Sequence, residues 1–95
     1  MQTLRLQSEI PLDFPAASRL ADAVAASLVG GSTTCLSWYD RERDHECPAH
    51  ASECHDGTCT VPGYVEYAES RGASLRVEID DGRFVFCYID VSEFD

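Results

Sequence analysis

The sequence predicts an α+β fold, a two-layer sandwich in which a mixed four-stranded sheet carries both helices on one face. Segments of alternating apolar and polar residues lie at both ends of the 95-residue chain, which is typical of strands with one solvated face. Two segments between them space their apolar residues as helices do. The predicted order is β-α-β-loop-α-β-β, within a single domain that spans residues 1–95.

The first half of the chain predicts a strand, a helix and a second strand. The strand covers residues 3–10 and puts three apolar residues on one face: Leu4, Leu6 and Ile10. Asp13 is a typical helix N-cap, and Gly30 with its neighbouring glycine ends the helix. The helix turns one apolar stripe to the core: Phe14, Ala17, Leu20, Ala21, Val24 and Leu28. The segment TCLSWYD, residues 34–40, is β-branched and aromatic and predicts the second strand.

The second half predicts a long loop over residues 41–60, a short helix and a hairpin. Thr60 is a plausible N-cap for the helical segment YVEYAESR, which Gly72 ends. Asp81-Gly82 is a strong signal for a two-residue type I′ turn. Such a turn fixes the register of the last two strands: Ile79 faces Phe84, Val77 faces Phe86 and Leu75 faces Tyr88.

Charge and composition exclude several classes of function. The chain has 17 acidic residues against seven arginines and no lysine, and a net charge of −10 repels nucleic acid and anionic membranes. The start of the chain lacks the pattern of a signal peptide, and no apolar run is long enough to cross a membrane. We therefore expect a cytoplasmic protein, where clustered cysteines bind metal or do redox chemistry more often than they form disulfides.

The segment HECPAHASECHDGTC, residues 45–59, carries three of the five cysteines and all three histidines. Thiolate and imidazole ligands suit zinc, and four of them match a tetrahedral Cys₃His site. The predicted ligands are Cys47, His50, Cys54 and Cys59. His45 and His55 can replace one of these ligands, or can orient a ligand by a hydrogen bond without contacting the metal. The alternatives are a polar surface loop with reduced thiols or a Cys54–Cys59 disulfide.

Three further features have competing interpretations. Cys59 precedes a helix, which favours a thiolate and suggests Cys–His catalysis, but no third orienting residue is visible. The segment from Trp38 to Arg41 suits either a binding site at a strand end or core packing with surface ion pairs. Cys35 and Cys87 lie within predicted strands and are expected to act as small apolar residues.

The hairpin also predicts a homodimer or a larger homo-oligomer. Its second face carries Val85, Cys87 and Ile89, and with both helices on the other side of the sheet these apolar residues would be exposed. Exposed apolar patches of this kind commonly mark interfaces. The substitution Val85→Asp would then yield monomers.

The segments LSWYDR (36–41), YAESRG (67–72) and FVFCY (84–88) resemble a family of small uncharacterised α+β domains from anaerobic archaea and bacteria. The resemblance covers nearly the whole chain. It implies a compact α+β fold and a cytoplasm that suits free thiols, and it brings no activity, cofactor or catalytic residue. The sequence thus predicts a small non-enzymatic domain that binds metal or forms a complex. The alternative is a small metal- or thiol-dependent enzyme, either a zinc hydrolase or a thiol redox protein.

Overall fold

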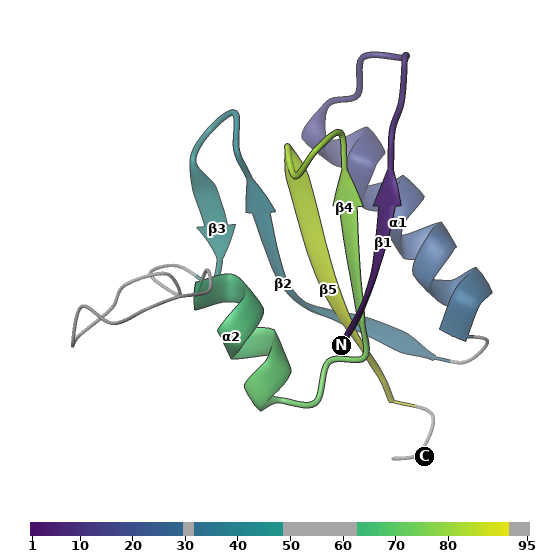
Figure 1. Ribbon diagram of the computed structural model, residues 1–95, viewed down its shortest axis with the longest axis vertical. Coiled ribbons are helices and arrows are strands. Elements are labelled where there is room, and N and C mark those ends of the chain that lie inside the picture. The colour runs from purple at the N-terminus through teal and green to yellow at the C-terminus, as the bar shows by residue number, and fades with distance from the viewer. Residues whose placement is uncertain (30–31, 49–62, 92–95) are drawn as a thin grey trace.

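A computed structural model describes residues 1–29, 32–48 and 63–91. Within these residues the chain forms one mixed sheet of five strands in the order β1-β4-β5-β2-β3, with two helices (Figure 1). The elements are β1 (Gln2–Leu6), α1 (Phe14–Val29), β2 (Thr33–Asp40), β3 (His45–Cys47), α2 (Gly63–Ser70), β4 (Leu75–Ile79) and β5 (Phe84–Asp90). The α+β class is confirmed, whereas the prediction of four strands is wrong.

The additional strand is β3, which lies inside the segment predicted as a loop. After β2 ends at Asp40, four residues turn the chain, and β3 pairs antiparallel with β2. Asp44 closes the turn with a φ of 48°, a left-handed conformation that Asp adopts more readily than most residues. β3 escapes prediction because its three residues are too few to show an alternating pattern.

The two helices pack on opposite faces of the sheet, so the prediction that they share one face is wrong. One core cluster joins α1 to Phe84, Phe86 and Tyr88 of β5. A second cluster joins α2 to Val85 and Cys87 on the other face of the same strand. The strand order explains the arrangement. The connection from β1 through α1 to β2 crosses the sheet in one direction, and the connection from β2 through β3 and α2 to β4 crosses it in the opposite direction. Crossovers of one hand that run in opposite directions put their helices on opposite faces.

The helix ends follow the predicted capping chemistry. The Asp13 carboxylate accepts a hydrogen bond from the backbone N–H of Ala16 at 2.9 Å, which confirms it as the N-cap of α1. At the end of α2, Gly72 has a φ of 89°, and the N–H of Ala73 donates to the carbonyl of Ala68 at 3.0 Å. This is a Schellman cap. The other predicted helix-end residues, Gly30 with the neighbouring Gly31 and Thr60, lie outside the described residues.

The side of α1 that faces the sheet is an alanine stripe. Ala17, Ala21 and Ala25 are fully buried, while Leu20 and Leu28, predicted to face the core, are 40% and 59% exposed. Ile10 is likewise exposed instead of extending the first strand. Small side chains at a spacing of four residues let the helix backbone approach the large aromatic side chains of β5 closely.

The closing hairpin has the predicted register. Leu75 pairs with Tyr88, Val77 with Phe86 and Ile79 with Phe84. Asp81 and Gly82 both have positive φ, as a type I′ turn requires. All residues of β5 from Phe84 to Tyr88 are buried, because both faces of this strand are covered.

Candidate functional site

Among the four predicted metal ligands, the structure describes one, and it lies in β3, an edge strand of the sheet. Of the four ligands, Cys47 is the last residue of β3, and its thiol is free and exposed. His50, Cys54 and Cys59 lie in the segment 49–62, outside the described residues, as does His55. The structure thus places one predicted ligand and one of the two named substitutes, His45.

His45 and Cys47 project from the same face of β3. Cys47 pairs with Trp38, and His45 pairs with Asp40. Directly opposite residues of an antiparallel pair point to one face, and Trp38 packs against the α1 core cluster. A thiol and an imidazole therefore stand two residues apart on the α1 side of an exposed edge strand. The sequence signal for this pair is the alternation in His45-Glu46-Cys47, whose Glu46 points the other way.

Trp38 forms a floor beneath this pair. Its ring stacks on the imidazole of His45 with a centroid distance of 6.2 Å and an interplanar angle of 20°. On its inner side Trp38 contacts Phe14 of α1 at 4.6 Å, and the Arg43 guanidinium lies over the Phe14 ring at 5.2 Å. The four side chains form a continuous stack from the start of α1 to the sheet edge. Such contacts limit the orientations open to the imidazole.

Asp40 fixes the turn that delivers β3. Only 2% of its surface is exposed, and its carboxylate accepts the backbone N–H of Glu42 at 3.1 Å and Nε of Arg43 at 2.6 Å. This buried network differs from the surface ion pair expected for Asp40. The Tyr39 hydroxyl donates to the Asp44 carboxylate at 2.9 Å, a bond that raises the pKa of Tyr39. Side chains of β2 therefore hold both ends of the turn before β3.

The two cysteines in the core differ chemically from Cys47. Burial raises the pKa of the Cys35 thiol to about 12, and burial also raises the pKa of Cys87. The Cys35 thiol donates a hydrogen bond to the carbonyl of Ser37 at 3.3 Å. Thiols with raised pKa values form little thiolate at neutral pH, so they are poor nucleophiles and poor metal ligands. Their predicted role as small apolar residues agrees with this environment.

The segment from Trp38 to Arg41 divides between the two faces of the sheet. Trp38 faces α1, whereas Tyr39 faces α2 and stacks on Tyr64 with ring centroids 5.2 Å apart. The two side chains pack in different clusters, and the Arg41 guanidinium donates to the carbonyl of Asp81 at 3.2 Å. Packing and turn formation account for these contacts. A β-bulge at Leu36 precedes them and sets which residues of β2 face each helix.

The surface predicted to form a dimer is not exposed. Val85 is 2% exposed and Cys87 is fully buried, because α2 covers this face, and Ile89 is half-buried. The basis of that prediction is therefore wrong, although homo-oligomerisation itself stays a prediction. Neither described helix has the length and apolar character to cross a membrane.

The described residues do not by themselves complete a metal site. Among residues 1–29, 32–48 and 63–91, no three His, Cys, Asp or Glu side chains gather around one point. His45 and Cys47 supply two donors, nitrogen and sulfur, of the types that zinc prefers.

Comparisons with known proteins agree with the fold and assign no activity. A family described as a domain of unknown function (DUF5619) matches residues 1–88. A crystal structure of a novel protein, AF1514, from Archeoglobus fulgidus superposes with a TM-score of 0.76 at 21% identity, covering 95% of this chain and 94% of that one. The search of curated proteins found no match. The structural similarity supports the α+β architecture.

Proposed function

The chain belongs to the DUF5619 family of unknown function, and we propose that it acts as a small non-enzymatic domain that binds one zinc ion through the segment following β2. The proposed ligands are Cys47, His50, Cys54 and Cys59, with His45 as the first substitute. The observation that supports this most is that His45 and Cys47 project from the same face of β3, an exposed edge strand.

The separation of the cysteines into two chemical classes supports the proposal. Cys35 and Cys87 lie in the cores with raised thiol pKa values, whereas Cys47 is exposed at the sheet edge. Cys54 and Cys59 follow within 12 residues of it in the sequence. In a reducing compartment three such thiols form thiolates when they meet zinc, and binding releases their protons.

Charge also favours a cation here. The segment 45–59 includes Glu46, Glu53 and Asp56, and the whole chain has a net charge of −10. The cost is mutual repulsion, since three thiolates and nearby carboxylates gather around one divalent ion. Zinc–thiolate bonding outweighs that repulsion in known Cys₃His sites, where the metal contributes folding energy directly.

The test is the metal content of protein prepared without an affinity tag under anaerobic, reducing conditions. We expect one zinc ion per chain in the native protein and a large loss of zinc in Cys47→Ser. Cys35→Ser is the matched control, because it makes the same chemical change at a partly buried thiol of the α1 core and should retain zinc. Equal, substoichiometric zinc in all three proteins would overturn the proposal.

Amide exchange extends this test to the neighbouring segment. If the ion orders the chain, the double variant Cys54→Ser, Cys59→Ser should exchange faster over residues 45–59, while β4 and β5 stay protected. Exchange that is equally fast in native protein and double variant would contradict a structural role for the ion.

The ligand count separates a structural site from the enzymatic alternative. Four protein ligands close a zinc site, whereas three ligands and a water molecule leave a position for chemistry. In protein loaded with Co²⁺, added cyanide should leave the visible absorption unchanged if four side chains bind the ion. A spectral shift on adding cyanide would favour the zinc hydrolase instead.

A further inference from the structure

The two edges of the sheet, β3 and β1, differ in how well they suit the addition of another strand. β3 has three residues, and Pro48, which has no N–H to donate, follows it directly. Short strands and prolines are features that protect an edge. β1 has five residues, no proline and an unbroken register with β4. Within the described residues no strand pairs with its outer edge (Figure 1), so this edge is open to strand addition.

The outer edge of β1 presents the backbone groups of two residues. The N–H of Gln2 donates to the carbonyl of Ser74 at 3.0 Å, so Gln2 bonds on the side of β4. Alternate residues of a strand bond to the same neighbour, so Leu4 also bonds to β4, whereas Thr3 and Arg5 turn their N–H and C=O groups outward. The edge therefore offers two donors and two acceptors.

This edge is complementary to itself. When a second β1 runs antiparallel with the two copies of Leu4 opposite each other, Thr3 of each copy lies opposite Arg5 of the other. Such hydrogen-bonded pairs exchange both of their N–H···O=C bonds, so four bonds satisfy all the outward groups. The neighbouring symmetric registers are worse. One sets Arg5 against Arg5, which opposes like charges, and the other sets Arg5 against Met1, outside the strand.

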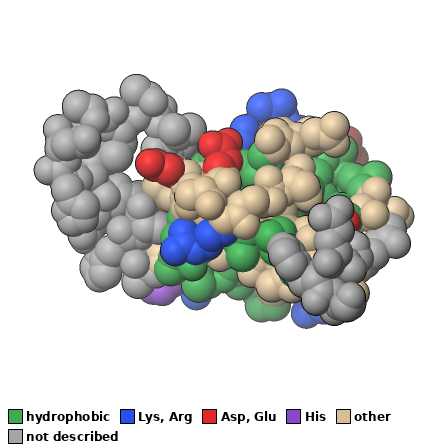
Figure 2. Space-filling view, turned by 90° about the horizontal axis from the view of Figure 1, so that it is seen from below, with side chains coloured by type: hydrophobic (Ala, Val, Ile, Leu, Met, Phe, Trp, Pro, Cys, Tyr) green, Lys and Arg blue, Asp and Glu red, His purple; other side chains and the backbone are tan. Residues whose placement is uncertain are grey.

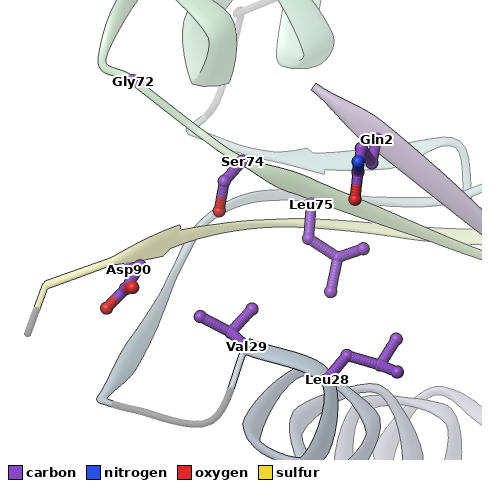
Figure 3. A pocket seen from close by; sticks show the side chains of 7 residues that line it. All are labelled: Gln2, Leu28, Val29, Gly72, Ser74, Leu75 and Asp90. Carbon is purple, nitrogen blue, oxygen red and sulfur yellow. The ribbon is translucent and has the colours of Figure 1, made fainter.

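The face of β1 on the α1 side is apolar and incompletely covered. Leu4 and Leu6 point to this side, because their partners on β4 belong to the α1 core cluster, and both are half-buried. A cavity of about 560 Å³ separates Gln2 at the start of β1 from Leu28 at the end of α1, and Leu28 is 59% exposed (Figure 3). Figure 2 views the molecule from the lower side of Figure 1, where hydrophobic side chains reach the surface between polar and charged ones.

The flank of α1 on the side of β1 is also apolar. Asp22 marks the other flank, because it accepts a hydrogen bond from the Tyr88 hydroxyl at 2.6 Å and interacts electrostatically with Cys35 of β2. Leu20 lies two residues from Asp22 and so points to nearly the opposite side of the helix, and it is 40% exposed. A second copy joined at β1 would turn its own α1 flank toward Leu20 and Val24 and remove part of this apolar surface from water.

Charge favours this surface for contact between two copies. Each chain has a net charge of −10, so two copies repel each other wherever their carboxylates face. Residues 1–8 include no acidic residue, and the only one in α1 is Asp22, on the flank toward β2. On the adjoining strand, Glu78 is paired with Arg5 at 2.8 Å. Contact through β1 therefore brings few carboxylates of the two copies together.

We propose that two copies of this chain associate through β1 to form one continuous sheet of ten strands, five from each copy. The two-fold axis passes between the two copies of Leu4, and both α1 helices lie on one face of the joined sheet. This surface differs from the second face of the hairpin, which α2 covers. β3, which carries Cys47, is at the opposite edge of the sheet, so association and metal binding can be tested separately.

Sedimentation velocity of the full-length protein, from low micromolar to near-millimolar concentration, tests the association. We expect a reversible change from the mass of one chain to that of two. Arg5→Pro removes an outward N–H and leaves the bonds to β4 in place, because a proline is tolerated where the N–H of an edge strand faces solvent. It should raise the dissociation constant of the dimer by roughly 30-fold or more, since two of the four bonds between the copies are lost.

Arg5→Ala is the matched control, because it removes the same side chain, with its ion pair to Glu78, but keeps the N–H. It should dimerise nearly as the native chain does. Circular dichroism checks that both variants are folded. Amide exchange of the native protein gives a second test without any substitution. The amides of Thr3 and Arg5 should exchange more slowly as the protein concentration rises, while that of Arg43, in the turn before β3, should not change.

Three results would overturn the proposal. The first is a native protein that keeps the mass of one chain at every concentration, which would leave the edge of β1 to a different partner. The second is equal dissociation constants for folded Arg5→Pro and Arg5→Ala. The third is association without slower exchange at Thr3 and Arg5, which would place the contact elsewhere. If Arg5→Pro does not fold, the exchange of the native protein decides.

Discussion

Asp40 carries a structural role that its sequence context does not reveal. It is 2% exposed and accepts hydrogen bonds from Glu42 and Arg43, so it holds the turn that leads into β3. The two hydrogen bonds contribute unequally to stability. The Arg43 side chain is 56% exposed, so water can replace Asp40 as its partner if Asp40 is removed. The backbone N–H of Glu42 is the group for which a replacement acceptor is harder to find.

We predict that Asp40→Ala lowers the free energy of unfolding by about 1–3 kcal/mol, because it removes a buried, charged hydrogen-bond acceptor that holds the turn. Arg43→Ala should cost less, within about 1 kcal/mol, as expected for a half-exposed ion-pair partner. Asp40→Asn keeps one acceptor oxygen and should fall between them. Urea unfolding of the three variants measures these differences. Equal costs for Asp40→Ala and Arg43→Ala would mean that the ion pair alone accounts for the role of Asp40.

The same residue scale shows what the sequence could reveal about the site. The abundance of cysteine and histidine in residues 45–59 predicts the region of the proposed metal site, and its ligand types favour zinc, without any structure. The placement of His45 and Cys47 on one face requires β3, and β3 depends on side chains of β2 that hold the turn. A cavity of about 560 Å³ at the end of α1 could not be predicted, because its lining residues come from four separate parts of the chain, in or beside β1, α1, β4 and β5.

At the scale of elements, local signals predicted the fold well and long-range ones did not. The N-cap at Asp13, the glycine cap at Gly72 and the turn at Asp81-Gly82 depend on neighbouring residues, and all three are confirmed. The side on which α2 packs depends on the strand order, which no local pattern encodes. The apolar residues Val85 and Cys87 were a correct sign that the second face of β5 is covered, but they were attributed to a second copy instead of α2.

The position of α2 changes the expected effect of substituting Val85. A dimer interface predicts that Val85→Asp gives a folded monomer. Packing under α2 predicts that Val85→Asp puts a carboxylate into a closed core and costs roughly 3 kcal/mol or more. Val85→Ala should cost about 2 kcal/mol through lost burial and a small cavity.

Ile10→Asp is the matched control for this prediction, since Ile10 is 70% exposed and the same type of change there should cost within about 0.5 kcal/mol. Urea unfolding followed by circular dichroism gives the stabilities, and light scattering gives the size of each protein. A Val85→Asp protein that is monomeric and as stable as the native chain would contradict the packing of α2 on β5.

At the scale of the whole molecule, charge sets the conditions under which the fold is stable. The net charge of −10 is large for 95 residues, and mutual repulsion among carboxylates opposes the compact state. Opposing this repulsion are ion pairs such as Arg5–Glu78 at 2.8 Å and Arg83–Glu42 at 2.6 Å. Each of these pairs has a partner more than half exposed and contributes at most about 1 kcal/mol. Repulsion among 17 acidic residues therefore outweighs them.

Added salt should consequently stabilise this protein, although it weakens the ion pairs. The screening length falls from about 10 Å at 0.1 M to about 3 Å at 1 M salt, so repulsion between distant carboxylates is reduced most. We predict that the midpoint of thermal unfolding at pH 7 rises between 0.05 and 0.5 M NaCl, and a gain of about 1 kcal/mol corresponds to roughly 4–8 °C.

Near pH 4.5, where Asp and Glu begin to take up protons, the rise should be smaller. In a variant with Glu66 and Glu69, both exposed on α2, changed to Gln, the rise at pH 7 should also be smaller. If NaCl instead lowers the unfolding midpoint at pH 7, attraction within the partly exposed ion pairs contributes more to stability than repulsion among the acidic residues takes away, which would contradict this prediction.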